Sequence, residues 1–224
     1  RQLQGAPGTD VTLIVLRGNA AEPHQVTLTR EVPPALAPAA RMLPSKIGYL
    51  RAAEFAAGTP AALRQAAARL QGEGAKALIL DLRGSARGPL EAGIESARAF
   101  VASGTLAILE SRGEGRRTIS AAADDGAITL PVAVLTDFGT AGPAELLAAA
   151  LTGNKRAETI GERTAGRASR QRLFPLPDGG SLWMSHAWYL TPAGIAIHER
   201  GLQPDLPVAQ PDVEFGSPVP DGDP

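Results

Sequence analysis

The sequence predicts an α/β fold with a mainly parallel sheet and helices on the faces of that sheet. From residue 46 onward, short apolar runs alternate with segments rich in helix-forming residues. Repeated strand–helix units of this kind place successive strands parallel, because each helix carries the chain back across the sheet. One unit, VAVLTDFGTAGPAELLAAAL at residues 132–151, is the most distinct: a buried-type strand, a glycine-rich turn and a helix with proline in its first turn.

An N-terminal β-hairpin is predicted from two β-rich runs, residues 10–17 and 25–30, on either side of a polar turn. Two strands alone are marginally stable, so this hairpin needs a surface to pack on. The Pro- and Ala-rich residues 32–45 then indicate an extended linker.

The core elements follow from apolar periodicity and from breaks at glycine and proline. A helix after Thr59-Pro60 has apolar residues at helical spacing, and ALILDL at residues 77–82 is typical of a buried parallel strand. The predicted elements are a strand at 47–55, a helix at 59–70, a strand at 77–82, a loop at 84–88, a helix at 89–102, strands at 105–110 and near 118, the unit at 132–151, a strand at 181–190 and a mobile tail at 210–224.

The composition excludes several functional classes. The net charge is −1 and the Arg residues are scattered, so no nucleic-acid partner is expected. No apolar run is long enough to span a membrane. The absence of cysteine excludes disulfides and thiolate catalysis, and the separated histidines His24, His186 and His198 show no metal-binding spacing, so we expect no metal or cofactor. The start of the chain reads as a processed or trimmed end without a signal peptide.

Four segments, in order, carry a family resemblance: KIGYLRAAEF, GAKALILDLRGSARGPL, TDFGTAGPAELLAAALTGNKRAETIGERTAGRASRQ and LFPLPDGGSLWMSHAWYLTPAGIAIHERGLQPDLPV. Together they resemble the carboxyl-terminal processing, or tail-specific, proteases, in which a PDZ module accompanies a crotonase/ClpP-like peptidase core. The resemblance covers roughly residues 3–208. It implies the C-terminal part of a PDZ-like module at 1–33, a linker at 34–46, the protease-like core at 47–208 and a Pro/Asp-rich tail at 209–224.

That resemblance also implies a Ser-Lys dyad, which this sequence does not contain. The family's serine stands fourth in a Gly-Ser/Thr-Ala-Ser turn, and residues 139–142 place Gly142 there. The family's lysine falls on Arg167, and of the catalytic set only Gln171, matching a residue that orients the lysine, is retained. Glycine has no side chain to attack with, and arginine does not give up its proton at physiological pH.

The oxyanion hole implied by the resemblance is altered as well. One donor would be the backbone N–H of the residue after the nucleophile, which is Pro143 and has none. The second donor loop reads Ser-Ala-Arg-Gly at residues 85–88, so that only Gly88 matches the family pattern. The sequence therefore predicts a chain that is not a peptidase by this mechanism, through natural degeneration or, less simply, an engineered change at Gly142.

Other residues leave alternatives open. A relocated nucleophile, Thr140 or Ser169, would make the chain an active serine-type endopeptidase. Arg87 and Arg167 either give the cleft a positive charge suited to a terminal carboxylate or form salt bridges with residues such as Glu162. Asp81 is interpreted as a structural hydrogen-bonding or ion-pairing residue. Glu145, one turn into the helix, is interpreted as stabilising the positive helix N-terminus.

The resemblance, taken with the missing dyad, implies a non-catalytic polypeptide-binding or scaffolding protein. Its partners would be a polypeptide or protein C-terminus, bound by strand addition, or an active protease relative that the chain regulates. It would work outside the cytoplasm, in the periplasm or cell envelope, and could form a homo-oligomer.

Overall fold

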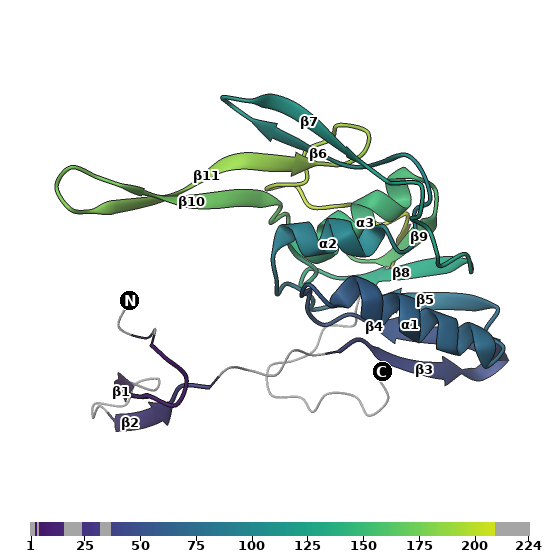
Figure 1. The fold of residues 1–224 in the computed structure, drawn as a ribbon, viewed down its shortest axis with the longest axis horizontal. Helices are drawn as coiled ribbons and strands as arrows, with labels where there is room; N and C mark the ends of the chain where they lie inside the picture. Colours follow the sequence, from purple (N-terminus) through teal and green to yellow (C-terminus); the bar gives the residue numbers. More distant parts are fainter. Residues whose placement is uncertain (1–2, 4, 16–23, 32–36, 209–224) are drawn as a thin grey trace. The chain divides into compact units, whose positions relative to one another are not determined.

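The computed structural model describes residues 3, 5–15, 24–31 and 37–208 (Figure 1). The chain divides into a small unit within residues 1–35 and a large unit within residues 36–224. The small unit is an antiparallel hairpin of β1 (Asp10–Val15) and β2 (His24–Thr29), which confirms the predicted hairpin. Its turn lies outside the described residues, as do the predicted tail and residues 34–36 of the predicted linker.

The large unit is built on a six-stranded, mainly parallel sheet, as predicted. The strand order is β12-β9-β8-β5-β4-β3, and every neighbouring pair is parallel except β3 with β4. The strands are β3 (Ala39–Leu43), β4 (Ile47–Arg51), β5 (Ala77–Asp81), β8 (Val132–Thr136), β9 (Ala157–Gly161) and β12 (Leu206–Pro207).

Strand β3 corrects the prediction of a linker at 34–46. Residues Ala39–Leu43 pair with β4, and a short 3-10 helix, Pro44–Lys46, joins the two strands. Tertiary contacts stabilise this edge strand: the Arg41 guanidinium lies 5.0 Å from the Tyr49 ring centroid, and Arg69 donates a 3.0 Å hydrogen bond to the Ala40 carbonyl. The neighbouring prolines flank the strand, where the missing N–H groups cost no ladder bond.

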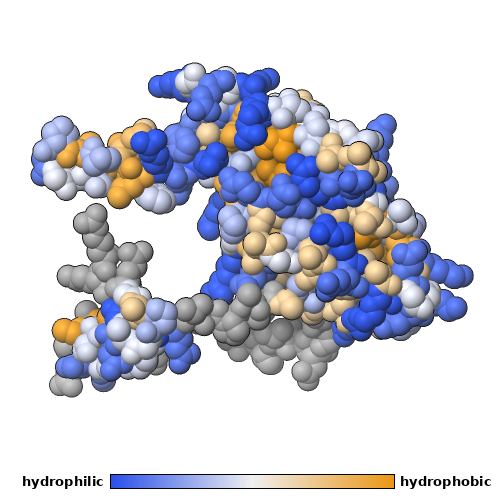
Figure 2. Space-filling model, viewed as in Figure 1, coloured by the Kyte–Doolittle hydropathy of each residue, from blue (hydrophilic) through white to orange (hydrophobic). Residues whose placement is uncertain are grey.

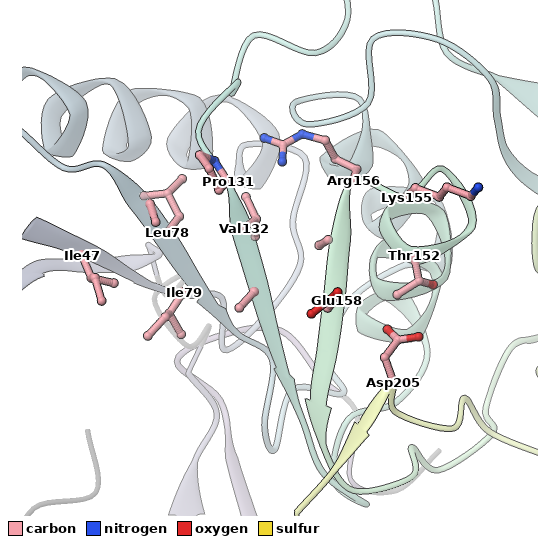
Figure 3. A pocket seen from close by; sticks show the side chains of 13 residues that line it. Ile47, Leu78, Ile79, Pro131, Val132, Thr152, Lys155, Arg156, Glu158 and Asp205 are labelled. Carbon is pink, nitrogen blue, oxygen red and sulfur yellow. The ribbon is translucent and has the colours of Figure 1, made fainter.

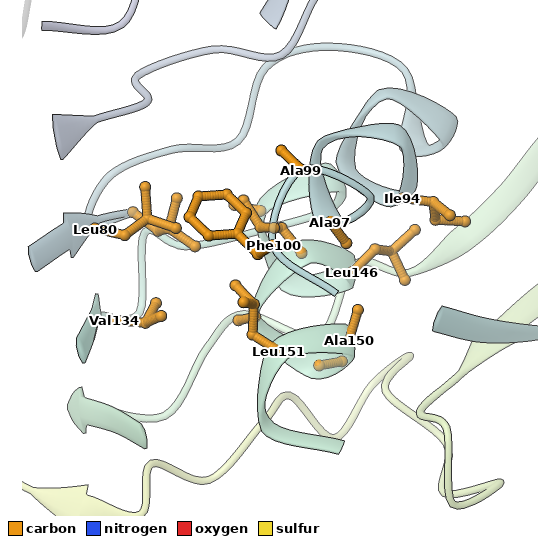
Figure 4. Close-up of a cluster of buried hydrophobic side chains, with 14 of the residues drawn as sticks. Leu80, Ile94, Ala97, Ala99, Phe100, Val134, Leu146, Ala150 and Leu151 are labelled. Carbon is orange, nitrogen blue, oxygen red and sulfur yellow. The ribbon is translucent and has the colours of Figure 1, made fainter. Parts of the chain in front are cut away.

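The α-helices of the described residues are α1 (Thr59–Gly72), α2 (Leu90–Ala97) and α3 (Pro143–Gly153). Helices α1 and α3 pack against strands of this sheet, and α2 packs mainly on α3. Figure 4 shows Leu80 and Val134 of the sheet facing Phe100 and Leu151, while Leu146 lies on the opposite side of α3, near Ile94. Helix α3 is buried along its whole length from residue 143 to 151, which explains its apolar and alanine-rich sequence. The predicted helix at 89–102 ends earlier, at residue 97, and the residues after it form turns.

A second sheet is antiparallel and has the order β10-β11-β6-β7. Its strands are β6 (Thr105–Ser111), β7 (Gly115–Ser120), β10 (Ser169–Pro175) and β11 (Ser181–Leu190). Helices α2 and α3 lie between the two sheets, and the β10–β11 hairpin extends well beyond them (Figure 1). Within the described ranges, no helix is long and apolar enough to cross a membrane.

Candidate functional site

The turn between β8 and α3 is fixed by hydrogen bonds to the loop that follows β5. The Thr140 hydroxyl donates to the Leu82 carbonyl at 2.9 Å, and the Ala141 N–H donates to the Ser85 carbonyl at 2.9 Å. From the other side, the Gly84 N–H donates to Asp137 Oδ1 at 2.9 Å. The carboxyl ends of two neighbouring parallel strands thus hold one rigid turn, as is typical of sites in α/β proteins.

Gly142 ends this turn in an unusual backbone conformation, with φ 58° and ψ −116°. A Cβ atom at this position would lie 3.5 Å from Leu90 Cδ2, 3.7 Å from the Arg167 carbonyl oxygen and 4.0 Å from the Ala86 carbonyl oxygen. These are ordinary van der Waals distances, so there is space for a side chain. The start of α2, the loop after β5 and the loop before β10 therefore meet at Gly142, where the resemblance described above would place a nucleophile.

Glu145 holds two of these segments together. Its carboxylate is fully buried and accepts hydrogen bonds from the backbone N–H groups of Gly142 (2.9 Å), Gly166 (2.7 Å) and Arg167 (2.7 Å), and from the Thr164 hydroxyl. It stabilises the start of α3, as the sequence predicted, and it also anchors the loop before β10, which the sequence reasoning missed. The available signal was its place three residues after Gly142, the spacing of a capping box.

Arg87 and Arg167 are both exposed and belong to the two loops whose backbones approach Gly142. In the described part of the chain, neither guanidinium makes a hydrogen bond or an ion pair, so the predicted pairing with Glu162 is not formed. Two unpaired positive charges thus lie on loops that meet at Gly142.

The loop carrying Arg87 is rigid. Ser85 is buried, and its hydroxyl donates a 2.6 Å hydrogen bond to the Ala52 carbonyl. Gly88 has φ 116°, and a Cβ there would lie 1.9 Å from the Phe55 carbonyl oxygen, so only glycine fits. Pro143, which follows Gly142 at the start of α3, has no backbone N–H to donate.

The remaining site candidates are engaged elsewhere. The Gln171 side-chain oxygen accepts a 2.6 Å hydrogen bond from Trp183 Nε1, so Gln171 contacts β11 and makes no bond to Arg167. The Ser169 hydroxyl lies 3.0 Å from the Ser185 hydroxyl. Thr140 is fully buried with its hydroxyl bonded to backbone, which leaves no path for a substrate.

Asp81 forms a buried ionic cluster beneath the site, which confirms its structural role. It accepts hydrogen bonds from Arg83, from the Tyr49 hydroxyl (2.6 Å) and from Arg51 (2.9 Å). Burial alone would raise the pKa of Asp81, but the hydrogen bonds from Arg83 and Tyr49 and the Arg83 charge outweigh it and lower the pKa.

Two further features bear on metal binding and on ligand binding away from this site. Among the described residues, no three His, Cys, Asp or Glu side chains are grouped so as to hold a metal ion. A hollow of about 800 Å³ lies over the amino-terminal ends of β5, β8 and β9, where Ile47 and Ile79 form an apolar floor (Figure 3). Its Arg156 is bonded to the carbonyls of residues 100, 128 and 130 and is structural.

Residues 46–208 match the sequence pattern of peptidase family S41. The chain belongs to this family. The carboxyl-terminal-processing protease of Synechocystis is 35% identical over 219 residues, covering 96% of this chain and 51% of the relative. Carboxyl-terminal-processing peptidase 2 of Arabidopsis thaliana, named as chloroplastic, is 36% identical over 217 residues, covering 93% of this chain and 42% of the relative.

A solved structure confirms the S41 fold. The photosystem II D1 C-terminal processing protease superposes with a TM-score of 0.70 at 30% identity, covering 92% of this chain and 57% of that one. This S41 chain spans about half the length of the curated relatives that it matches. The predicted resemblance and the α/β core are therefore confirmed.

Proposed function

We propose that this S41 chain is a pseudoprotease that binds polypeptide without cleaving it. The observation that carries the proposal is Gly142, which occupies the turn at the start of α3 in a conformation suited to a nucleophile and has space around it, but presents no reacting atom. Covalent catalysis of acyl transfer requires an activated hydroxyl at this point. The residues at the general-base and oxyanion positions are also unsuited to hydrolysis.

Two further groups support the loss of hydrolysis. At the position of the general base, residue 167 is an arginine, and a guanidinium does not serve as a general base in proteins. At the oxyanion position, Pro143 supplies no N–H, and loss of one such donor costs on the order of 10²–10³ in rate. Each change alone would slow the reaction strongly.

The alternative of a relocated nucleophile is not favoured by the geometry. Thr140 is inaccessible, and its hydroxyl already donates to the Leu82 carbonyl. Ser169 bonds the Ser185 hydroxyl, which has no basic character that could activate it.

Polypeptide binding is proposed from the relatives and from the surface charge. Processing proteases act on polypeptide C-termini, and a chain that keeps their frame is suited to the same kind of ligand, added as an extended strand. Arg87 and Arg167, both unpaired among the described residues, would attract its terminal carboxylate. We further propose that β1 and β2 are a remnant of a PDZ module and that the chain works outside the cytoplasm.

The test combines a chemical probe with a binding assay. Incubation with a fluorophosphonate should leave the mass of the chain unchanged, whereas an active S41 relative treated in parallel becomes labelled. A fluorescent peptide with a free carboxyl terminus should bind, and Arg167→Ala together with Arg87→Ala should weaken binding several-fold, with Arg112→Ala as an exposed-arginine control. Labelling of any Ser or Thr, or absence of peptide binding, would contradict the proposal.

A further inference from the structure

The β10–β11 hairpin is an extended arm with apolar side chains on both faces. Leu173 and Trp183 are cross-strand partners on one face, and Phe174 and Leu182 are partners on the other. Leu173 is 44% exposed, Leu182 48% and Trp183 61%, and Figure 2 shows the apolar surface along the arm. A two-stranded ribbon is marginally stable alone, and exposed apolar surface of this kind marks an interaction site.

Strand β10 also has a free edge. It is the last strand of its sheet in the described residues. The Leu176 N–H donates to the Gly180 carbonyl on the β11 side, and backbone groups alternate in direction along an antiparallel strand. The N–H and C=O groups of Gln171 and Leu173 therefore point away from β11, and so does the C=O group of Pro175. No lysine blocks this edge, and its one proline stands at the end.

We propose that this edge pairs with the same edge of a second copy of the chain, antiparallel, about a two-fold axis at Leu173. In this register the two Leu173 residues form a hydrogen-bonded pair with two N–H···O=C bonds. Each Gln171 N–H donates to the C=O of the second copy's Pro175. Because proline has no N–H, the return bond to the Gln171 C=O is absent, and each such pair keeps one hydrogen bond instead of two. The interface is self-complementary, as a two-fold axis requires.

The side chains select this register. It sets Arg172 opposite the second copy's Phe174, and within one chain the Arg172 guanidinium already lies 5.1 Å from the Phe174 ring centroid. A two-fold axis at Arg172 would instead place two like charges directly opposite, which is unfavourable. The Leu173 register also brings the two Trp183 side chains onto one face and joins the two four-stranded sheets into one sheet of eight strands.

A disulfide test reads out the register directly, because the chain contains no cysteine. Cα atoms of a hydrogen-bonded antiparallel pair are about 5.5 Å apart, within the range that a disulfide spans. Oxidation of full-length Leu173→Cys should give a covalent dimer. Arg172→Cys is the matched control, since its Cα atoms would be about 8 Å apart and should cross-link poorly.

The second measurement is the molar mass of the uncross-linked chain by light scattering across a concentration series. The native sequence should form a dimer, and Leu173→Pro should be monomeric with unchanged far-ultraviolet circular dichroism, since an outward-facing proline is tolerated in an edge strand. A native chain that stays monomeric, a Leu173→Pro dimer, or equal cross-linking at Arg172→Cys would overturn the proposal. A chain that stays monomeric and pairs its β10 edge only with a peptide would also overturn the proposal.

Discussion

The backbone N–H of Arg167 donates a 2.7 Å hydrogen bond to the buried carboxylate of Glu145. This bond joins the loop before β10 to the first turn of helix α3. The same carboxylate accepts a 2.9 Å hydrogen bond from the Gly142 N–H, so one buried side chain fixes both segments.

Replacing Glu145 tests this anchor. Glu145→Ala leaves three backbone N–H groups and the Thr164 hydroxyl without their acceptor in a buried environment. We expect the free energy of unfolding to fall by about 3–5 kcal/mol. Urea unfolding measures it, with the exposed Glu114→Ala as a control that should change stability by less than about 0.5 kcal/mol. A loss as small as the control's would show that the anchor is dispensable.

Restoring the missing groups should restore reactivity stepwise. Gly142→Ser fits the available space, although the positive φ costs on the order of 1–3 kcal/mol of stability. Alone it should react slowly with a fluorophosphonate, and Arg167→Lys should then accelerate labelling by supplying a base. Adding Pro143→Ala returns an oxyanion donor and should raise the rate a further 10²–10³-fold, roughly.

These rates are compared by mass spectrometry after each variant has been shown to unfold cooperatively. Gly142→Ala with the same two companion changes is the matched control and should stay unlabelled. If the triple variant is folded yet reacts no faster than that control, the assignment of Gly142 to the nucleophile position is wrong.

The two tyrosines should both resist alkaline titration. Burial, followed by the neighbouring Asp81, raises the pKa of Tyr49, and burial together with Glu91 raises the pKa of Tyr189 to about 12. The folded state thus favours the neutral phenols. Their contribution to stability is complete below the unfolded pKa of about 10 and is lost as pH rises through the folded values.

Because the chain has no other tyrosine, the near-ultraviolet absorption of tyrosinate reports these two groups alone. Tyrosinate should appear together with loss of native circular dichroism. Both phenols could instead ionise fully at about pH 10, roughly the value for an exposed tyrosine, while the chain is still folded. That result would contradict the burial of both side chains.

Asp81 should make stability depend on acid pH. Its pKa is lowered in the folded state, so its contribution is present above the unfolded value of about 4 and is lost as pH falls through the folded value. Asp81→Asn should lower the free energy of unfolding by about 3–5 kcal/mol at neutral pH. The difference from the native chain should shrink toward acid pH, whereas the exposed Asp124→Asn should show little effect. A difference that does not vary with pH would argue for a packing defect instead.

The parts of the fold that were predictable share one property: their pattern is local. The strand, turn and helix at 132–151 were confirmed because the apolar run, the glycines and the alanine-rich helix adjoin in sequence. Strand β3 was missed because its sequence, AARML, has no alternating apolar pattern and because Arg69, which bonds the Ala40 carbonyl, is distant in the chain. A short run between prolines carries no sign of such partners.

The same distinction applies to the site. The residues at the positions proposed for nucleophile and base could be assigned from sequence, since residue identity alone shows that Gly142 has no side chain that could attack. The contact of Gln171 with Trp183, the burial of Thr140 and the lack of a partner for Arg167 depend on side-chain packing, for which sequence offers no period or spacing.

The most direct test of the pseudoprotease proposal follows one sample over time. A peptide with a free carboxyl terminus is incubated with the purified chain, and its mass and its bound fraction are measured together. The account predicts that the peptide is bound and is recovered intact. Cleavage products that disappear on changing Thr140→Val or Ser169→Ala would show a working nucleophile and contradict it.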